Sequence, residues 1–128
     1  IFNFMETKTK IIKREFKINN KSLNNYDFYF ITEIGHNHQG DIKKAFKLIK
    51  QAKDAGSNAV KLQKRDNKSL YTKKFFNEKY DNRNSYGETY GLHREALEFG
   101  KKEYKELQSY ANEIGIDLFA TPFDLNSV

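Results

Sequence analysis

Four polar side chains stand at the ends of three short apolar segments, and a lysine and a threonine among them could bind an anion. Glu33 ends the first segment, Lys61 and Gln63 end the second, and Thr121 follows the third. Parallel α/β folds collect their chemistry at the carboxyl ends of the strands, so these side chains can meet. Because side chains alternate along a strand, Lys61 and Gln63 point the same way. A lysine that faces inward is costly unless it meets a carboxylate or an anionic ligand.

Spacing alone leaves two interpretations of this group open. In the structural interpretation, Glu33 and Lys61 form a buried ion pair that only holds the first two strands together. In the functional interpretation, Lys61 anchors a phosphate or a carboxylate and Thr121 adds a hydroxyl donor. A purely structural pair would need neither Gln63 nor Thr121 beside it, which favours anion binding.

The three histidines do not define a metal site. His36 and His38 form an H-x-H pair, a spacing that some metal sites use. Because no third histidine or carboxylate accompanies them, we expect both to shape a turn through hydrogen bonds to the backbone. His93 begins a predicted helix and is expected to be structural or exposed. The sequence shows no Ser/His/Asp arrangement, and the absence of cysteine excludes a disulfide or a thiolate metal site.

The elements that position these residues alternate between strand and helix. In chain order, the apolar patterns predict a strand at 28–34, a helix at 42–52, a strand at 58–63, a helix in two parts at 93–99 and 101–113, and a strand at 116–120. Asp41 is the predicted N-cap of the first helix, and Gly56 and Gly115 are predicted helix ends. This order predicts an α/β chain with a parallel sheet, either in a barrel or in an open doubly wound sheet. The turn at 35–40 matches neither G-x-G-x-x-G nor a Walker A loop, which disfavours dinucleotide binding.

A long loop is predicted after the second strand, over residues 64–91. Loops between a strand and a helix usually have about 2–6 residues. This one carries six aromatic residues among charged ones, namely Tyr71, Phe75, Phe76, Tyr80, Tyr86 and Tyr90. We therefore expect it to pack on, or close over, another part of the molecule. Residues 1–27 are predicted to be a separate extension with a small β-element at 16–18 and a turn at 19–21.

The formal net charge of +6 allows a basic nucleic-acid-binding module as an alternative of another class. The lysines are spread along the predicted helices and loops, however, which is typical of a solvated surface. The loop is the only candidate region, and its acidic residues Asp66, Glu78, Asp81 and Glu88 count against it. No apolar run approaches the roughly 20 residues of a membrane span, and no signal-peptide pattern is present. We therefore expect a cytoplasmic protein that binds neither nucleic acid nor membrane.

Four stretches resemble the sialic acid synthase family (N-acetylneuraminate synthase and its nonulosonate relatives). Residues 31–40, ITEIGHNHQG, resemble the E-I-G-x-N-H-x-G signature of that family, and residues 54–63 are similar to its A-G-a-D-a-V-K-f-Q strand. Tyr86-Gly87-Glu88-Thr89 is similar to a family loop element, and Thr121-Pro122-Phe123-Asp124 to its T-P-F-D strand end. One departure is that Asn58 stands where Asp is common. The resemblance covers residues 28–128, and four separate motifs in the same order make it far more specific than a single motif.

The resemblance implies a (β/α)₈ TIM barrel that condenses phosphoenolpyruvate with N-acetylmannosamine, or a related amino sugar, to give N-acetylneuraminate and phosphate. By position, it implies that Lys61 and Thr121 bind phosphoenolpyruvate, that Gln63 binds the sugar, and that Glu33 is the catalytic residue at the reacting sugar. It also implies Mn²⁺ or another divalent metal, with ligands expected beyond residue 128, and a homodimer. A legionaminate- or pseudaminate-type acceptor remains an alternative.

The length of 128 residues suggests only part of such a barrel, which needs roughly 250. We therefore expect residues 28–128 to be the N-terminal portion of a truncated TIM barrel, with Met5 as the natural start. A fragment with an unpaired strand edge and without the metal ligands is expected to be inactive by itself.

Overall fold

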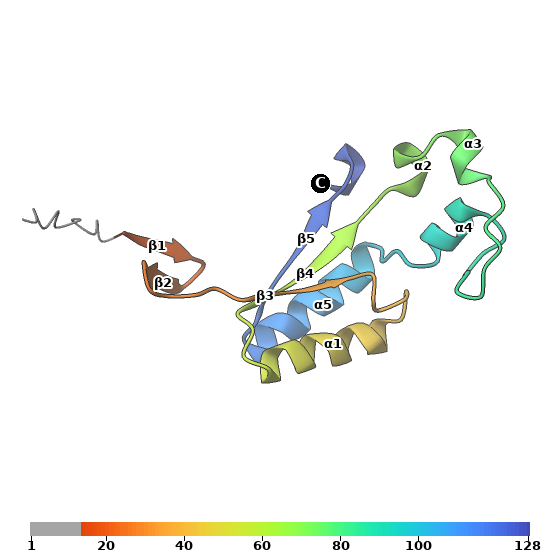
Figure 1. The fold of residues 1–128 in the computed structure, drawn as a ribbon. Coiled ribbons are helices and arrows are strands. Elements are labelled where there is room, and N and C mark those ends of the chain that lie inside the picture. The colour runs from red at the N-terminus through yellow and green to blue at the C-terminus, as the bar shows by residue number, and fades with distance from the viewer. Residues whose placement is uncertain (1–13) are drawn as a thin grey trace, which may run out of the picture.

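The computed structural model describes residues 14–128, which form a three-stranded parallel sheet with two long helices on one face (Figure 1). The strands are β3 (Ile31–Gly35), β4 (Ala59–Lys64) and β5 (Asp117–Pro122), in the order β3-β4-β5. Helix α1 (Ile42–Asp54) lies between β3 and β4 in the chain, and α5 (Lys101–Ile114) precedes β5. The predicted α/β chain with a parallel sheet is therefore confirmed.

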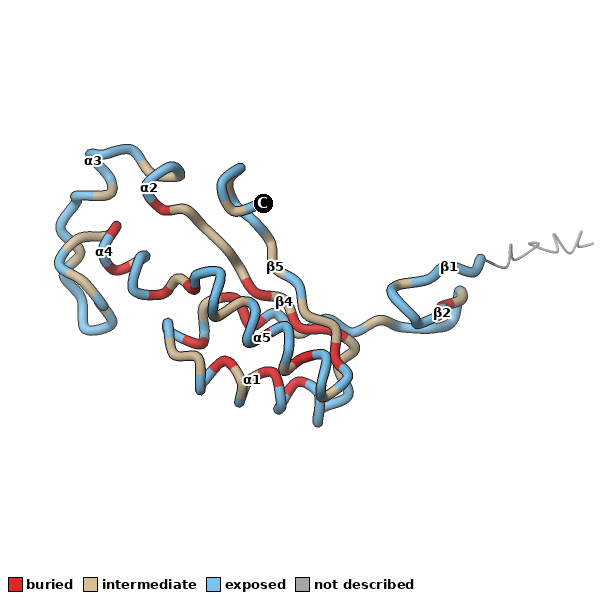
Figure 2. Tube along the Cα trace, turned by 180° about the vertical axis from the view of Figure 1, so that it is seen from behind, coloured by how far each residue is buried: buried red, intermediate tan, exposed pale blue. Residues whose placement is uncertain are grey.

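The two faces of the sheet have different surroundings. Val60 and Leu62 of β4 are fully buried and form a core with apolar residues of α1 and α5 (Figure 2). Burying each such side chain contributes about 1.5–3 kcal/mol to stability. Lys61 and Gln63 alternate with them along β4 and therefore lie on the opposite face. The helices thus leave the face that carries Lys61 and Gln63 open.

Side-chain caps and glycines determine where the two long helices begin and end. The Asp41 carboxylate accepts hydrogen bonds from the backbone amides of Lys43 and Lys44, so the predicted N-cap of α1 is confirmed. Gly115 ends α5 in a left-handed conformation with φ 71°, also as predicted. The first strand is shorter than predicted, because its ladder with β4 begins at Ile31 and leaves Phe28 and Phe30 largely exposed.

A loop at 64–91 and a helix at 93–99 were predicted between β4 and α5, but this part of the chain contains three short helices instead, and the last of them ends at Glu95. These helices are α2 (Asn67–Leu70), α3 (Lys73–Phe76) and α4 (Tyr90–Glu95), which begin after the caps Asp66, Thr72 and Thr89. The aromatic side chains pack on one another, with ring centroids 4.6 Å apart for Phe75–Tyr90 and for Tyr80–His93. The aromatic residues of this segment thus form a cluster of their own.

A β-hairpin precedes the sheet, at the position where the sequence suggests a turn. Its strands are β1 (Glu15–Ile18) and β2 (Lys21–Asn24), which pair antiparallel. Asn19 of the turn donates a 2.7 Å hydrogen bond to Asp117 at the start of β5. Residues 1–13 of the predicted extension lie outside the described part, and its separation from residues 28–128 as a domain stays a prediction. No helix in residues 14–128 is long and apolar enough to cross a membrane.

Gly40 sets how closely the loop after β3 approaches the end of α4. Its φ is 72°, and a Cβ built at this position would lie 2.2 Å from the backbone oxygen of Ala96. A side chain would therefore push the loop away from the segment that carries Glu98. Gly56 offers a comparison, because its φ is 88° and nothing lies within 4 Å of the position of its Cβ.

We predict that Gly40→Ala lowers the free energy of unfolding by about 2–4 kcal/mol, from the left-handed conformation and the backbone clash together. Gly56→Ala introduces the conformational strain without the clash and should cost only about 1 kcal/mol. Urea unfolding of the two variants measures both values. Equal losses would mean that the loop moves aside freely and that the close approach is unimportant.

His38 is a buried side chain that prefers to be neutral. It is 1% exposed, stacks on Phe99 with ring centroids 4.0 Å apart, and accepts a hydrogen bond from the Gly40 amide. The expectation that it shapes the turn through the backbone is confirmed. Burial, and secondarily the charge of His36, lowers the pKa of His38 from 6.5 to about 4.

Stability should therefore decrease in mild acid. Between pH 6.5 and 4 the unfolded chain binds a proton at His38 that the folded protein does not, so the free energy of unfolding falls as the pH falls through this range, by up to about 3 kcal/mol. Urea titrations at several pH values should show this slope in the native sequence and a shallower one in His38→Phe. The same slope in both proteins would contradict the assignment to His38.

Candidate active site at the carboxyl ends of the strands

Glu33 and Lys61 form an ion pair on the open face of the sheet. The two residues are register partners on β3 and β4, and Lys61 Nζ lies 2.9 Å from Glu33 Oε2. The structural interpretation expected this pair to be buried, but the side chains are 44% and 33% exposed for Glu33 and Lys61. Because water screens an exposed pair, its contribution to stability is at most about 1 kcal/mol. The Lys61 ammonium group is thus available to a ligand.

Gln63 and Thr121 extend this polar group towards β5. They are register partners in the parallel ladder, two residues beyond the Lys61–Phe119 pair, so all four side chains belong to the same face. Gly35 lies beside the group, because a Cβ at its position would be 3.5 Å from both Gln63 Nε2 and Glu33 Oε1. The structure therefore brings together all four residues that the sequence singled out.

A second polar group lies next to Gln63, and the sequence patterns did not predict it. Its centre is Glu98, whose side chain is only 8% exposed. His36 Nε2 lies 3.0 Å from Glu98 Oε1, while Lys64 Nζ and the Arg65 amide each lie 3.1 Å from Oε2. Burial alone would raise the pKa of Glu98, but the contacts with His36, the Arg65 amide and Lys64 outweigh burial and lower it.

The His36–Glu98 contact is close but not an aligned hydrogen bond, since neither His36 Nε2 nor Glu98 Oε1 has a partner of good hydrogen-bond geometry. It is best described as an electrostatic contact that orients the imidazole. The prediction that His36 bonds to the backbone is wrong, because its side chain instead contacts Glu98 and two arginines.

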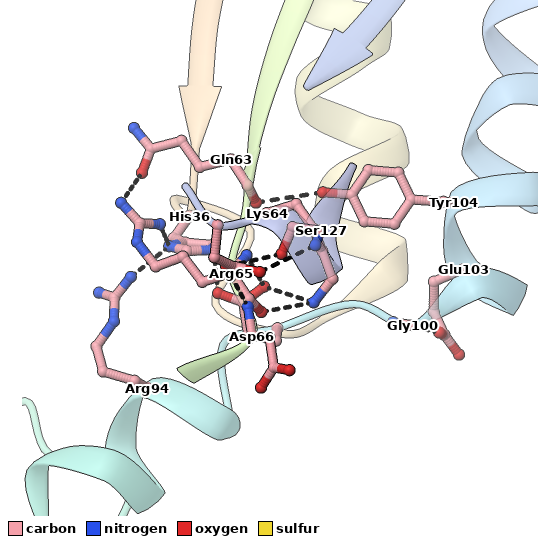
Figure 3. Close-up of polar contacts among 12 residues, drawn as sticks. His36, Gln63, Lys64, Arg65, Asp66, Arg94, Gly100, Glu103, Tyr104 and Ser127 are labelled. Carbon is pink, nitrogen blue, oxygen red and sulfur yellow. Dashed lines mark hydrogen bonds and ion pairs between the residues drawn. The ribbon is translucent and has the colours of Figure 1, made fainter. Parts of the chain in front are cut away.

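Arg65 and Arg94 approach the other nitrogen of His36 (Figure 3). Arg94 Nη2 lies 2.9 Å from His36 Nδ1, and Arg65 Nη1 lies 3.2 Å from the same atom. Arg65 also donates to Gln63 Oε1 at 2.9 Å, and its guanidinium lies 3.7 Å above the Phe123 ring. His36 drew attention as half of an H-x-H pair, and Lys64 and Arg65 are charges at the end of β4, whereas Glu98 and Arg94 carried no sequence signal for this group.

The remaining histidine has a structural role. His93 is 9% exposed and accepts a hydrogen bond from the Tyr86 amide, in agreement with the prediction. Within residues 14–128, no group of three or more His, Asp or Glu side chains is placed to hold a metal ion. The side chains of this site therefore do not fit a divalent metal, and we assign it no ligand here.

Comparisons with known proteins agree with this geometry. The model of the NeuB family matches residues 48–128. Mouse N-acetylneuraminate-9-phosphate synthase is 45% identical over 96 residues, which cover 75% of this chain and 27% of the mouse protein. N,N'-diacetyllegionaminic acid synthase of Legionella pneumophila is 33% identical over 101 residues, covering 78% of this chain and 28% of that enzyme. This chain thus spans little more than a quarter of either relative.

A solved structure has the same fold over nearly the whole chain. The N-acetylneuraminic acid (sialic acid) synthetase of Leptospira borgpetersenii, crystallised with citrate, superposes with a TM-score of 0.67 and 30% identity. The superposition covers 90% of this chain and 36% of the synthetase. With more than half of its residues matched by the family model and four strand-end residues gathered on one face of a parallel sheet, this chain belongs to the NeuB family of sialic acid synthases.

Proposed function

We propose that the protein carrying this chain condenses phosphoenolpyruvate with N-acetylmannosamine, or a related amino sugar, to give N-acetylneuraminate or a relative and phosphate. The observation that carries this proposal is the accessible Lys61 ammonium group at the carboxyl end of β4, paired with Glu33 and flanked by Gln63 on the same face. Membership of the NeuB family supports the reaction class. We further propose that the strands belong to a TIM barrel, whose interior would be the open face.

Lys61 and Thr121 bind phosphoenolpyruvate in this proposal. The ammonium group is a compact charge that can move from the Glu33 carboxylate to a phosphate or carboxylate of the substrate. Thr121 lies on the neighbouring strand, in register with Gln63, and its hydroxyl can donate to the same anion. Gln63 directs its amide group towards the acceptor sugar, while its oxygen is held by Arg65.

Glu33 acts at the acceptor. C3 of phosphoenolpyruvate attacks the aldehyde carbon of the open-chain sugar, water adds at C2, and the C2–O bond to phosphate breaks. Glu33 Oε1 and Gln63 Nε2 each lie 3.5 Å from a Cβ built at Gly35, so both flank Gly35, and a sugar held by Gln63 would lie within reach of the carboxylate. A carboxylate there can hold the proton that is exchanged between water and the sugar oxygen.

We also propose that the complete protein requires Mn²⁺ or another divalent metal, forms a homodimer and is located in the cytoplasm. No residue of this chain is assigned to these three properties. A legionaminate-type acceptor is a variant of the same chemistry, and relatives with that activity support it. A 9-phosphate product would need an acceptor phosphorylated at carbon 6, because phosphoenolpyruvate supplies the first three carbons.

The main test measures phosphate release from phosphoenolpyruvate by the complete protein with N-acetylmannosamine and Mn²⁺. Release should require the sugar. In Lys61→Ala, kcat/KM for phosphoenolpyruvate should fall ten- to hundredfold, which corresponds to the loss of a charged hydrogen bond worth about 1.5–3 kcal/mol. Lys47→Ala is the matched control, because Lys47 is exposed on α1 and far from the open face. Unchanged kinetics in Lys61→Ala would refute the role of Lys61 in binding phosphoenolpyruvate.

Glu33→Gln separates catalysis from a merely structural ion pair. We predict that kcat falls at least tenfold, while the free energy of unfolding changes by less than about 1 kcal/mol, because the pair is exposed. The KM for phosphoenolpyruvate should not rise, since Lys61 no longer competes with a carboxylate for its ligand. If instead stability falls by several kcal/mol and kcat of the folded protein is normal, the structural interpretation is correct.

A further inference from the structure

The side-chain amide of Gln63 is held in one orientation by its neighbour Arg65. Arg65 Nη2 donates a 2.9 Å hydrogen bond to Gln63 Oε1, and the amide nitrogen points away from the guanidinium (Figure 3). Because a guanidinium can only donate, the amide oxygen and not the amide nitrogen must face Arg65. Gln63 therefore presents its N–H donors to the open face, beside Glu33.

The imidazole of His36 is the hydrogen-bond acceptor that holds Arg65 from the other side. Arg65 Nη1 and Arg94 Nη2 lie 3.2 and 2.9 Å from His36 Nδ1. Since both arginines can only donate, Nδ1 carries a lone pair, and the single proton of the neutral ring is on Nε2, facing Glu98. A protonated imidazole would turn an N–H towards two guanidinium groups. The arrangement therefore needs His36 in its neutral form.

The orientation of Arg65 depends on few contacts. Among the described residues, its guanidinium donates hydrogen bonds to His36 Nδ1 and Gln63 Oε1. The Phe123 ring lies 3.7 Å below the guanidinium, and a flat ring leaves the guanidinium free to turn in its own plane. Burial, and next the charge of Arg94, lowers the pKa of Arg65, so its charge is poorly compensated. Loss of the His36 contact would therefore release Arg65.

His36 is surrounded by groups that act on its charge in opposite directions. Its side chain is 10% exposed, and Glu98 favours a proton on the ring while Arg65 and Arg94 oppose one. The His38 ring lies edge-on to it, with centroids 5.7 Å apart. His36 also stands at a position that the E-I-G-x-N-H-x-G signature leaves open. Its contacts are therefore a property of this chain and are not implied by the signature.

We propose that His36 is a positioning residue for sugar binding, which in its neutral form holds Arg65 in the orientation that turns the N–H donors of Gln63 towards the sugar. This inference rests on the proposed function and adds a control of how the sugar is bound. Because Gln63 is then a donor only, the sugar must offer it an oxygen lone pair. When His36 takes up a proton, Nδ1 becomes a donor, Arg65 turns away, and the Gln63 amide loses its fixed orientation.

The test measures the KM for N-acetylmannosamine at saturating phosphoenolpyruvate, with Mn²⁺, in the complete protein. His36→Leu removes the hydrogen-bond acceptor and should raise this KM about tenfold, with the KM for phosphoenolpyruvate changed less than about threefold. His36→Asn places an amide oxygen near the position of Nδ1 and should keep the KM for the sugar within about threefold of the native value. Gln63→Glu keeps a partner for Arg65 but has no donor, and should raise this KM at least as much as His36→Leu.

The pH dependence distinguishes a positioning role from a merely structural one. Histidine changes its charge between about pH 8 and pH 5, and the KM for N-acetylmannosamine should rise in the native protein as the pH falls through this range. In His36→Asn the rise should be absent, because the amide does not titrate, while His38 and Glu98 are present in both proteins. Melting temperatures at each pH identify any loss of folded protein. Equal pH profiles would overturn the proposal, and so would a native KM in His36→Leu, since the Phe123 contact would then suffice to orient Arg65.

Crystal structures of the complete protein separate this inference from the proposed reaction. In His36→Leu the Arg65 guanidinium should lie beyond hydrogen-bond distance of Gln63 Oε1, whereas in His36→Asn the contact should remain. This difference supports the positioning role even if no phosphate is released from phosphoenolpyruvate with any amino sugar, in which case the proposed function fails by itself. An unchanged Arg65–Gln63 contact in His36→Leu refutes the positioning role, even if the condensation occurs.

Discussion

The alternation of side chains along β4 is the constraint on which both the fold and the site depend. Val60 and Leu62 are fully buried under α1 and α5, whereas Lys61 and Gln63 lie on the open face. A shift of one residue would bury a lysine and an amide and expose two apolar side chains, each worth about 1.5–3 kcal/mol in the core. The packing that stabilises the sheet therefore also directs the proposed substrate ligands.

Much of this arrangement could be predicted, because it follows from local patterns. The Asp41 cap, the apolar stripe of α1 and the left-handed Gly115 are all set within a few residues of the chain. Glu33 and Lys61 are joined by a single β-α-β unit, so their meeting follows from the register of neighbouring parallel strands. The helices α2 and α3 could not be predicted in this way, since a single turn is too short to show an apolar period and depends on its capping side chain.

The group around Glu98 could not be predicted, because tertiary contacts alone assemble it. Glu98 lies 33 residues from Arg65, and Arg94 lies 58 residues from His36. Their approach depends on how the segment between β4 and α5 folds back, and on the space that the missing side chain of Gly40 leaves for the Ala96 carbonyl. The histidine pair drew attention as a metal motif, yet His36 works as an acceptor for arginines and His38 as a stacked core residue.

Lys61 and the arginine pair Arg65–Arg94 are two cationic groups with different partners, and this difference suits a reaction that joins two substrates. The Lys61–Glu33 pair is exposed to water, so an anion can replace Glu33 as the partner of Lys61 at small cost. Glu98 is buried and held by three neighbours, so it stays in place and leaves the two guanidinium groups short of acceptors. The exposed pair can therefore exchange its partner, whereas the buried group is fixed in one arrangement. Gln63 lies two residues beyond Lys61 on the same face and is bonded to Arg65, so the group around Glu98 holds the Gln63 side chain beside the exposed Lys61–Glu33 pair.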